Sequence, residues 1–304
     1  MNRRLMAAIA VSVFLAACGS VAPGTTAQTV PLAGTPNGVA VRDSDGAVFV
    51  TDDRTNGIVM TTHIGEEDAP AFSLYARIPA AAGERTGLSQ IAFAPNGHLL
   101  VEQFGFGTAA AVFDVAPSGQ VALASDTNSA RRRLGLLVLD SGTFLSSWFV
   151  KEGSAPPAGG VSVITRGTAP RQMIERDIVT GLGKPVGLAA VGDMLYVSDQ
   201  AANRIYKVDL QAARAASAPV PASDVFATVD APDLMAATPD GTLYTKCGAH
   251  AVCSFSKRGR PTVVADGFEA PRGVAVDVAR KRLIAVDRSS APDKPSALRV
   301  VPIR

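Results

Sequence analysis

The chain has 304 residues, of which 47% are hydrophobic and 18% charged, so it can bury a large core, and intrinsic disorder is excluded for most of it. Its 29 basic and 27 acidic residues nearly cancel, which excludes the strong positive footprint of a nucleic-acid-binding protein. Beyond the N-terminal segment, no apolar run reaches the roughly 18 residues that a membrane-spanning helix needs.

The N-terminal segment, residues 1–17, has the pattern of an export signal. Arg3 and Arg4 form a short basic region, and an apolar stretch of the length of a signal-peptide core runs from Met6 to Leu15. The run Leu-Ala-Ala-Cys that ends at Cys18 resembles the lipobox of bacterial lipoproteins. That resemblance implies cleavage before Cys18 and lipidation of its thiol. The alternative is an ordinary secretory signal with an incidental cysteine.

The residue after Cys18 is Gly19, not Asp, which in lipoproteins of this type favours the outer membrane. We therefore expect a lipid-anchored protein in the outer membrane, facing the periplasm or the cell surface. Residues 18–28 are small and polar, as is typical of a flexible tether. The membrane is thus an expected partner through Cys18, nucleic acid is not, and we expect a monomer.

The rest of the chain, residues 29–304, repeats one pattern six times. Each repeat has a small residue, an apolar triplet, a polar turn, a second apolar run and often an Asp. The repeats begin near positions 38, 90, 134, 187, 234 and 273. A third short apolar run follows in each repeat, and a fourth follows in several, with Gly, Pro, Asn and Asp between them. Helical periodicity is confined to the brief window Leu210–Ala216.

Four short strands per unit, at a period of roughly 40–50 residues, predict propeller blades. Six units therefore predict an all-β chain that forms a six-bladed β-propeller. A single blade cannot bury both of its faces, so each blade has to pack on its neighbours and the ring has to close. We expect residues 29–32 to complete the last blade beside residues 298–303, which would remove an open sheet edge.

Two cysteines, Cys247 and Cys253, flank a short connection between two predicted strands. A connection of this length can bring paired strands within disulfide range, and an exported protein meets an oxidising compartment. A zinc site would need more thiols or imidazoles than the nearby His250 supplies. The spacing therefore predicts a disulfide between Cys247 and Cys253.

The loops that enter the innermost strands of a propeller meet at the mouth of its central channel, where ligands bind. The residues just before the six repeats are Asn37, Ser89, Arg133, Val186, Asp233 and Arg272. Oxygen ligands for a hard cation could come from Asn37 and Asp233, with Ser89 or Gln90 assisting. In contrast, Arg133 and Arg272 oppose a cation and suit a carboxylate or phosphate.

Several of these turns resemble blades of the senescence marker protein/gluconolactonase family, although similar repeats occur in other six-bladed propellers, including NHL-repeat proteins. The turns are Pro36-Asn37-Gly38, Lys184-Pro185-Val186-Gly187 and Pro232-Asp233-Leu234. The resemblance implies a divalent cation, such as Ca, Zn or Mn, that binds a lactone carbonyl and activates water. It also implies a metal held by a first-blade Glu, an Asn and an Asp.

Asp233 matches the Asp of that set, but the other two positions depart from it. The corresponding fourth-blade turn has Val186 where the family has Asn, and the first-blade position holds Asn37 where the family has Glu. Two functions are therefore compatible with the sequence. The first is a binding propeller with a degenerate metal site, which takes a small molecule or a protein at the channel mouth. The alternative is a metal-dependent hydrolase of a lactone or small ester, with Asp233 as ligand and Asn37 assisting; no catalytic residue is assigned.

Two other features carry simpler interpretations. An Asp follows the second strand of three repeats, at positions 52, 199 and 287, and its recurrence favours turn capping over a carboxylate cluster. The basic run Arg131–Arg133 is interpreted as a solvated turn or a loop covered by aliphatic stems, with a phosphate site as the less favoured alternative. Trp148 belongs either to the core or to the wall of a pocket.

Overall fold

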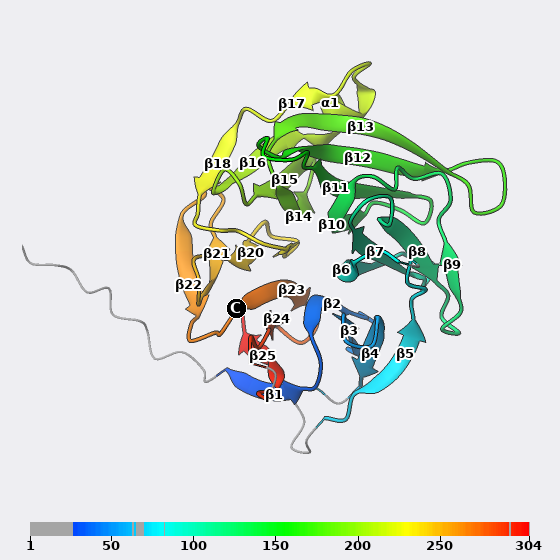
Figure 1. Ribbon diagram of the computed structural model, residues 1–304. Coiled ribbons are helices and arrows are strands. Elements are labelled where there is room, and N and C mark those ends of the chain that lie inside the picture. The colour runs from blue at the N-terminus through cyan, green and yellow to red at the C-terminus, as the bar shows by residue number, and fades with distance from the viewer. Residues whose placement is uncertain (1–26, 63, 65–69, 82, 292, 304) are drawn as a thin grey trace, which may run out of the picture.

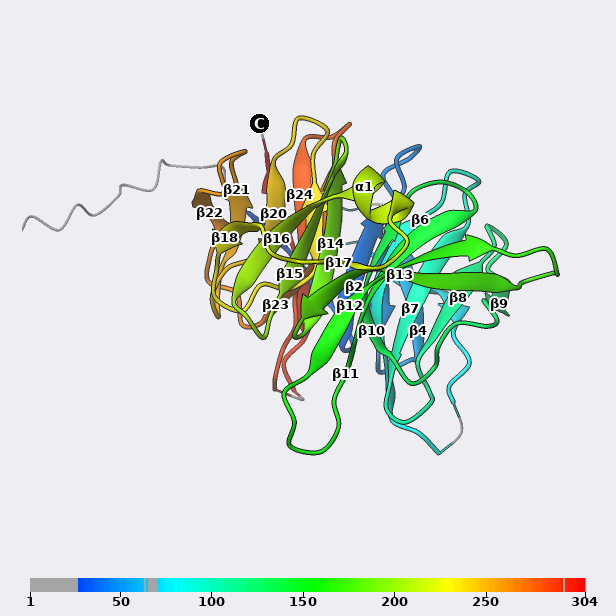
Figure 2. The same ribbon diagram turned by 90° about the horizontal axis from the view of Figure 1, so that it is seen from above.

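The computed structural model describes residues 27–62, 64, 70–81, 83–291 and 293–303 (Figure 1). The predicted signal peptide, Cys18 and the tether up to residue 26 lie outside the described residues. Six sheets, antiparallel except for one added strand, stand in a ring around a central axis, so the predicted six-bladed β-propeller is confirmed. Innermost strands such as β2 (Pro36–Val41) and β14 (Pro185–Val191) run along that axis (Figure 2).

The first three blades follow one another along the chain. Blade 1 consists of β2, β3 (Val48–Asp52), β4 (Gly57–Thr61) and β5 (Ser73–Arg77). Blade 2 consists of β6 (Thr86–Phe93), β7 (Leu99–Gly105), β8 (Ala111–Val115) and β9 (Val121–Leu123). Blade 3 consists of β10 (Arg132–Val138), β11 (Thr143–Val150), β12 (Ala158–Arg166), β13 (Met173–Leu182) and the added strand β17 (Val220–Pro221).

The last three blades complete the ring. Blade 4 consists of β14, β15 (Met194–Asp199), β16 (Arg204–Asp209) and β18 (Val225–Thr228). Blade 5 consists of β19 (Met235–Ala237), β20 (Leu243–Lys246), β21 (Val252–Phe255) and β22 (Pro261–Ala265). Blade 6 consists of β23 (Pro271–Asp277), β24 (Arg282–Asp287), β25 (Ser296–Pro302) and, from the other end of the chain, β1 (Gln28–Leu32).

Strand β1 closes the ring as expected, because it pairs antiparallel with β25. Val30 lies opposite Leu298, and Leu32 lies opposite Ser296. Both Val30 and Leu32 are buried. The closure satisfies the backbone edge of β25 and joins the two ends of the described chain within one sheet.

The insertion between β16 and β18 contains the single helix of the described residues, α1 (Leu210–Ala215). The carboxylate of Asp209 accepts a hydrogen bond from the backbone N–H of Ala212 and so caps the helix. The helix then leads into β17, which pairs in parallel with β13 and covers the outer edge of blade 3. None of the described helices is long and apolar enough to cross a membrane.

The hydrophobic core consists of six clusters, and each cluster fills the space between two neighbouring blades. Phe49 of blade 1, for example, is fully buried in a cluster with Leu99 and Val101 of blade 2. Side chains alternate between the two faces of a strand, so each blade supplies apolar groups to both of its neighbours. The stability of one blade therefore depends on the blades beside it.

A hydroxyl on the second strand of blades 1, 3 and 4 ties neighbouring innermost strands together near the axis. Ser198 accepts a hydrogen bond from the N–H of Gly187 in its own blade (2.6 Å) and donates one to the carbonyl of Asp233 in the next blade (2.8 Å). The same position holds Thr51 in blade 1 and Ser147 in blade 3, with equivalent bonds. In blade 2, the register of β7 places Glu102 there.

The recurring Asp residues cap the loops that enter the mouth, as predicted. The carboxylate of Asp52 accepts the N–H groups of Thr35 and Arg54, and that of Asp199 accepts those of Gly183 and Lys184. In blade 6 the carboxylate of Asp287 accepts the N–H groups of Glu269 and Ala270. Each carboxylate thus holds the chain just before an innermost strand and fixes where the residues of the mouth stand.

Candidate functional site

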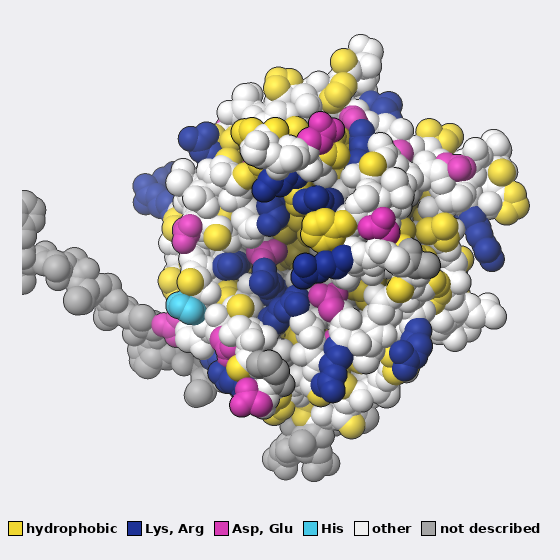
Figure 3. All heavy atoms as spheres, viewed as in Figure 1, with side chains coloured by type: hydrophobic (Ala, Val, Ile, Leu, Met, Phe, Trp, Pro, Cys, Tyr) yellow, Lys and Arg dark blue, Asp and Glu magenta, His cyan; other side chains and the backbone are white. Residues whose placement is uncertain are grey.

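Lys and Arg side chains gather over the centre of the ring, where the innermost strands converge (Figure 3). Lys184 interacts electrostatically with Lys246, Arg272 and Asp233, although the four residues come from blades 4, 5 and 6. We refer to Lys184, Lys246 and Arg272, together with Asp233, as the central basic cluster. Three cations around one carboxylate leave this part of the mouth with an excess of positive charge.

The predicted metal ligand Asp233 contacts an arginine in the structure. Its Oδ2 atom lies 3.4 Å from Nη1 of Arg272, and its Oδ1 atom accepts the backbone N–H of Leu234 at 3.0 Å. The side chain of Asp233 is 8% exposed, whereas that of Arg272 is 37% exposed. The guanidinium therefore neutralises the carboxylate and still presents part of its surface to solvent.

Lys184 stands beside this pair, and its backbone N–H is held by the carboxylate of Asp199 at 2.8 Å. Its Nζ atom donates to the side-chain oxygen of Gln200 at 2.6 Å. Burial lowers the pKa of Lys184; Asp233 opposes the shift, and the charges of Arg272 and Lys246 add to it. A cation in such surroundings is stabilised by a bound anion.

Lys246 ends β20 and begins the short connection that the disulfide closes. The predicted bond between Cys247 and Cys253 is present, with the two Cα atoms 5.7 Å apart. The N–H of Cys247 also donates to the carbonyl of Ala251. The disulfide and this hydrogen bond restrain the chain directly after Lys246, so its place at the mouth is fixed by the hairpin.

Two of the residues proposed as oxygen ligands for a divalent cation make different hydrogen bonds in the structure. The side-chain amide of Asn37 donates to the carbonyl of Leu88 at 2.9 Å, and the hydroxyl of Ser89 donates to the carbonyl of Leu134 at 2.6 Å. Gln90 is buried, and its Oε1 atom has no hydrogen-bond partner among the described residues.

Over the described part of the chain, no group of three or more His, Cys, Asp or Glu side chains is placed to hold a metal ion. Ca²⁺ prefers six to eight oxygen ligands. Here the mouth carboxylate, Asp233, already faces the guanidinium of Arg272, with Lys184 beside it. A divalent cation in this place would be repelled by both cations.

Arg133 lies inside blade 3 and not at the mouth. Its side chain is fully buried, and its guanidinium donates to Glu175 at 2.6 Å and to the hydroxyl of Ser146 at 2.9 Å. The reason is an offset of one residue: Gly135 occupies the position of Gly38 and Gly187, so Leu134 directly precedes the repeat and Arg133 stands one residue earlier, opposite Trp148. Arg133 is therefore unavailable to a ligand.

The other arginines of the basic run are also engaged, in two different ways. Arg131 pairs with Glu175 and Asp177 and lies over the ring of Trp148, 3.8 Å from its centre. Trp148 in turn donates its ring N–H to Ser162, so it belongs to this network within blade 3. Arg132 points to the opposite side of the strand, where it lies over aromatic rings. The run is thus neither a solvated turn nor a phosphate site.

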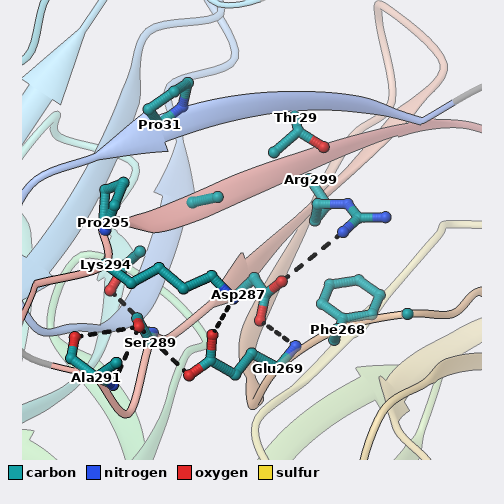
Figure 4. Close-up of a pocket in the computed structure, with 13 residues that line it drawn as sticks. Thr29, Pro31, Phe268, Glu269, Asp287, Ser289, Ala291, Lys294, Pro295 and Arg299 are labelled. Atoms are coloured by element: carbon teal, nitrogen blue, oxygen red, sulfur yellow. Dashed lines mark hydrogen bonds and ion pairs between the residues drawn. The ribbon is translucent and has the colours of Figure 1, made fainter.

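A separate cavity of about 630 Å³ lies on blade 6, between the loop before β23 and the strands β25 and β1 (Figure 4). Its charged side chains pair with one another. Lys294 lies 2.6 Å from Glu269, and Arg299 lies 3.8 Å from Asp287. Asp287 also caps the loop through backbone N–H groups. This cavity offers a ligand no unsatisfied charge, so the central basic cluster remains the stronger candidate.

No protein-family model matches the chain, and no curated protein sequence matches it. Solved structures do. A gluconolactonase from Xanthomonas campestris is 16% identical, with a TM-score of 0.68 over 91% of this chain and 90% of that one. The calcium-binding protein regucalcin from Agrobacterium tumefaciens is 14% identical, with a TM-score of 0.66 over 90% and 93%.

The chain shares their six-bladed fold. A chain of a nidogen/laminin complex also matches it, at 13% identity and a TM-score of 0.59, over 81% of this chain and 86% of that one. The structures of the same fold thus include a lactonase, a calcium-binding protein and a component of a protein complex. Fold alone does not decide between these functions, so the side chains at the mouth have to do so.

Sequence reasoning missed two of the three cations in the central basic cluster, although a signal for each is present. Lys184 lies two residues before Val186, so it is not one of the residues that directly precede the six repeats. Lys246 stands at the end of a second strand, where three other blades have a capping Asp. A cation in place of that recurring Asp is the kind of exception that can indicate a functional residue.

Proposed function

We propose that this propeller binds a small anionic molecule, a carboxylate or a phosphate, at the central basic cluster. The observation that carries the proposal is the contact between Arg272 and Asp233, which places a guanidinium where the family resemblance would place a metal. Lys184 and Lys246 add two further cations, and no carboxylate lies within ion-pair distance of either Nζ atom among the described residues. An anion would complete this set.

The proposal predicts anion binding that depends on the cluster. We expect citrate or inorganic phosphate to bind at low ionic strength in isothermal titration calorimetry, and both Lys184→Met and Arg272→Gln to weaken binding about tenfold, because each removes a charge-assisted contact. Lys207→Met is the matched control, because Lys207 pairs with Asp224 on the outside of blade 4. Equal binding by parent and cluster variants, or no binding at all, would contradict the proposal.

Metal-dependent hydrolysis of a lactone or small ester is the second candidate, supported by the position of Asp233 at the mouth and by the similarity to the gluconolactonase fold. Elemental analysis of the protein after dialysis against Ca²⁺, Zn²⁺ and Mn²⁺ distinguishes the anion-binding function from the hydrolase function. The anion-binding proposal predicts less than one equivalent of metal. One equivalent that disappears in Asp233→Ala would favour the hydrolase instead.

We also propose that the protein is exported and anchored through a lipid on Cys18. The lipobox-like sequence supports this, as does the disulfide in blade 5, since disulfides persist in oxidising compartments. Expressed in a bacterium with lipoprotein-processing enzymes, the protein is expected to enter the detergent phase of a Triton X-114 separation. The Cys18→Ala variant is expected to stay in the aqueous phase, and equal partitioning of the two would contradict lipid anchoring.

A further inference from the structure

Three phenylalanine rings form a continuous row on the blade 2 and blade 3 side of the mouth. Phe104 and Phe106 come from the end of β7 and the residue after it, and Phe149 comes from the end of β11. The ring centres of Phe104 and Phe106 are 5.2 Å apart, and those of Phe104 and Phe149 are 6.3 Å apart. Phe104 and Phe106 are partly exposed, whereas Phe149 is almost buried. We refer to these three residues as the aromatic row.

Cations lie over two rings of the aromatic row, those of Phe106 and Phe149. The guanidinium of Arg132 lies 4.5 Å from the ring centre of Phe106 and 5.6 Å from that of Phe149. The guanidinium of Arg85 lies 5.9 Å from the ring centre of Phe106. Within the described residues, no carboxylate lies within ion-pair distance of Arg132 or Arg85, in contrast to the acid-paired Arg131 and Arg133.

Lys184 connects the aromatic row to the central basic cluster. Its Nζ atom lies 5.8 Å from the ring centre of Phe149 and also interacts with Arg272 and Lys246. In Figure 3, hydrophobic side chains accordingly lie directly beside Lys and Arg side chains at the centre of the face. An anion bound to Lys184 would therefore lie close to the aromatic row, beginning at the ring of Phe149.

We propose that the ligand of this mouth is an aromatic carboxylate, whose charged group binds the central basic cluster and whose ring packs against the aromatic row. This inference rests on the proposed function and narrows it. The cations of the cluster select an anion, and the partly exposed rings of Phe104 and Phe106 favour a flat apolar group next to it. Aromatic rings in contact add to the free energy of binding beyond the area that they bury.

The inference is tested by titrating the protein with acetate, cyclohexanecarboxylate, benzoate and 2-naphthoate. These probes share one carboxylate and differ in the group attached to it. We expect benzoate to bind at least about fivefold more tightly than acetate, with 2-naphthoate tighter still and cyclohexanecarboxylate in between. This comparison uses the unchanged protein, so it does not depend on whether any variant folds.

Two variants assign the preference to the aromatic row. Phe106→Leu is expected to reduce the ratio of benzoate to acetate affinity to about two. Phe226→Leu is the matched control, because Phe226 packs on Tyr196 in blade 4, away from the row. A ratio that falls equally in both variants would overturn the inference.

The outcomes separate this inference from the proposed function. If acetate, citrate and benzoate all bind through Lys184 and Arg272 with no preference for the ring, the inference fails and the anion site stands. If citrate and phosphate do not bind and no carboxylate binds, the proposed function fails and this inference fails with it. Benzoate affinity that is the same in Lys184→Met as in the parent would place the aromatic ligand elsewhere and overturn the inference.

Discussion

Replacing Gly135 by alanine is expected to lower the stability of this propeller by about 3 kcal/mol or more, because the blades approach one another too closely there. A Cβ atom on Gly135 would lie 1.8 Å from the carbonyl oxygen of Val186 in the next blade and 2.9 Å from Oγ of Ser147. Real contacts of this kind are not shorter than 3.0 Å, and a backbone carbonyl in a sheet cannot move aside alone. Blades 3 and 4 would therefore have to separate near the axis.

Thermal unfolding measures this effect, and the expected decrease in Tm is roughly 6 °C or more. Gly142→Ala is the matched control in the same blade, because its nearest neighbour would be 3.7 Å away. The equivalent glycines give a graded series, with the nearest carbonyl at 2.2 Å for Gly38 and 2.5 Å for Gly187. A decrease for Gly142→Ala as large as that for Gly135→Ala would contradict the explanation, and so would a reversed order in the series.

Replacing Glu102 by glutamine is expected to stabilise the protein above pH 8 and to leave it nearly unchanged at pH 4. Glu102 is fully buried between blades 2 and 3, at the position where other blades have a hydroxyl. Burial raises its pKa from 4.5 to about 8; the Ser146 hydroxyl and the Arg133 guanidinium oppose this shift, and Glu175 adds to it. Neither of its oxygens has a hydrogen-bond partner of normal geometry among the described residues.

The direction of this pH effect follows from the pKa values of Glu102 in the folded and the unfolded protein. The folded protein holds the proton of Glu102 more tightly than the unfolded chain does, so this residue lowers stability as the pH rises from about 4.5 to about 8. The full pKa shift would correspond to about 5 kcal/mol of lost stability. Relaxation of the protein around the ionised carboxylate reduces this loss. We therefore expect Glu102→Gln to raise the free energy of unfolding by roughly 2 kcal/mol at pH 9. Denaturant unfolding of parent and variant between pH 4 and pH 9 measures this gain.

Glu175→Gln is the contrasting control. Although burial alone would raise the pKa of Glu175, its contacts with Arg133, the N–H of Asn128 and Arg131 outweigh burial and lower it. Its contribution to stability is therefore present above its ordinary pKa and is lost as the pH falls through its folded pKa. Glu175→Gln should thus destabilise the protein at neutral pH. If the stability difference between Glu102→Gln and the parent stays constant from pH 4 to pH 9, the pKa of Glu102 does not differ between the folded and unfolded protein, and the explanation fails.

The candidate site could be predicted only in part from the repeats. Asp233 and Arg272 directly precede a repeat, and they meet at the mouth as their positions indicate. Arg133 is expected to precede a repeat in the same way, but the repeat begins at Gly135, so Leu134 takes that position and Arg133 lies inside blade 3, where Glu175 neutralises it. The position of a residue within a repeat gives the end of the strand at which it lies, but an offset of one residue along a strand sends its side chain to the opposite face.

The sequence by itself determined the features that depend on residues close together in the chain. The alternation of apolar and polar residues set the strands, the recurring Asp such as Asp199 set the loop caps, and the spacing of Cys247 and Cys253 set the disulfide. The six-fold repetition then determined the ring, since a blade that cannot bury both faces needs a neighbour on each side.

The tertiary structure alone decided which side chains meet at the mouth. Asp233 meets the cation Arg272 across 39 positions of the chain, and Lys184 meets Phe149 from a different blade. Glu102 likewise acquires its raised pKa from burial between two blades. Charge pairing, ring contacts and desolvation act through space between segments that the closed ring brings together, so no pattern along a single repeat contains them.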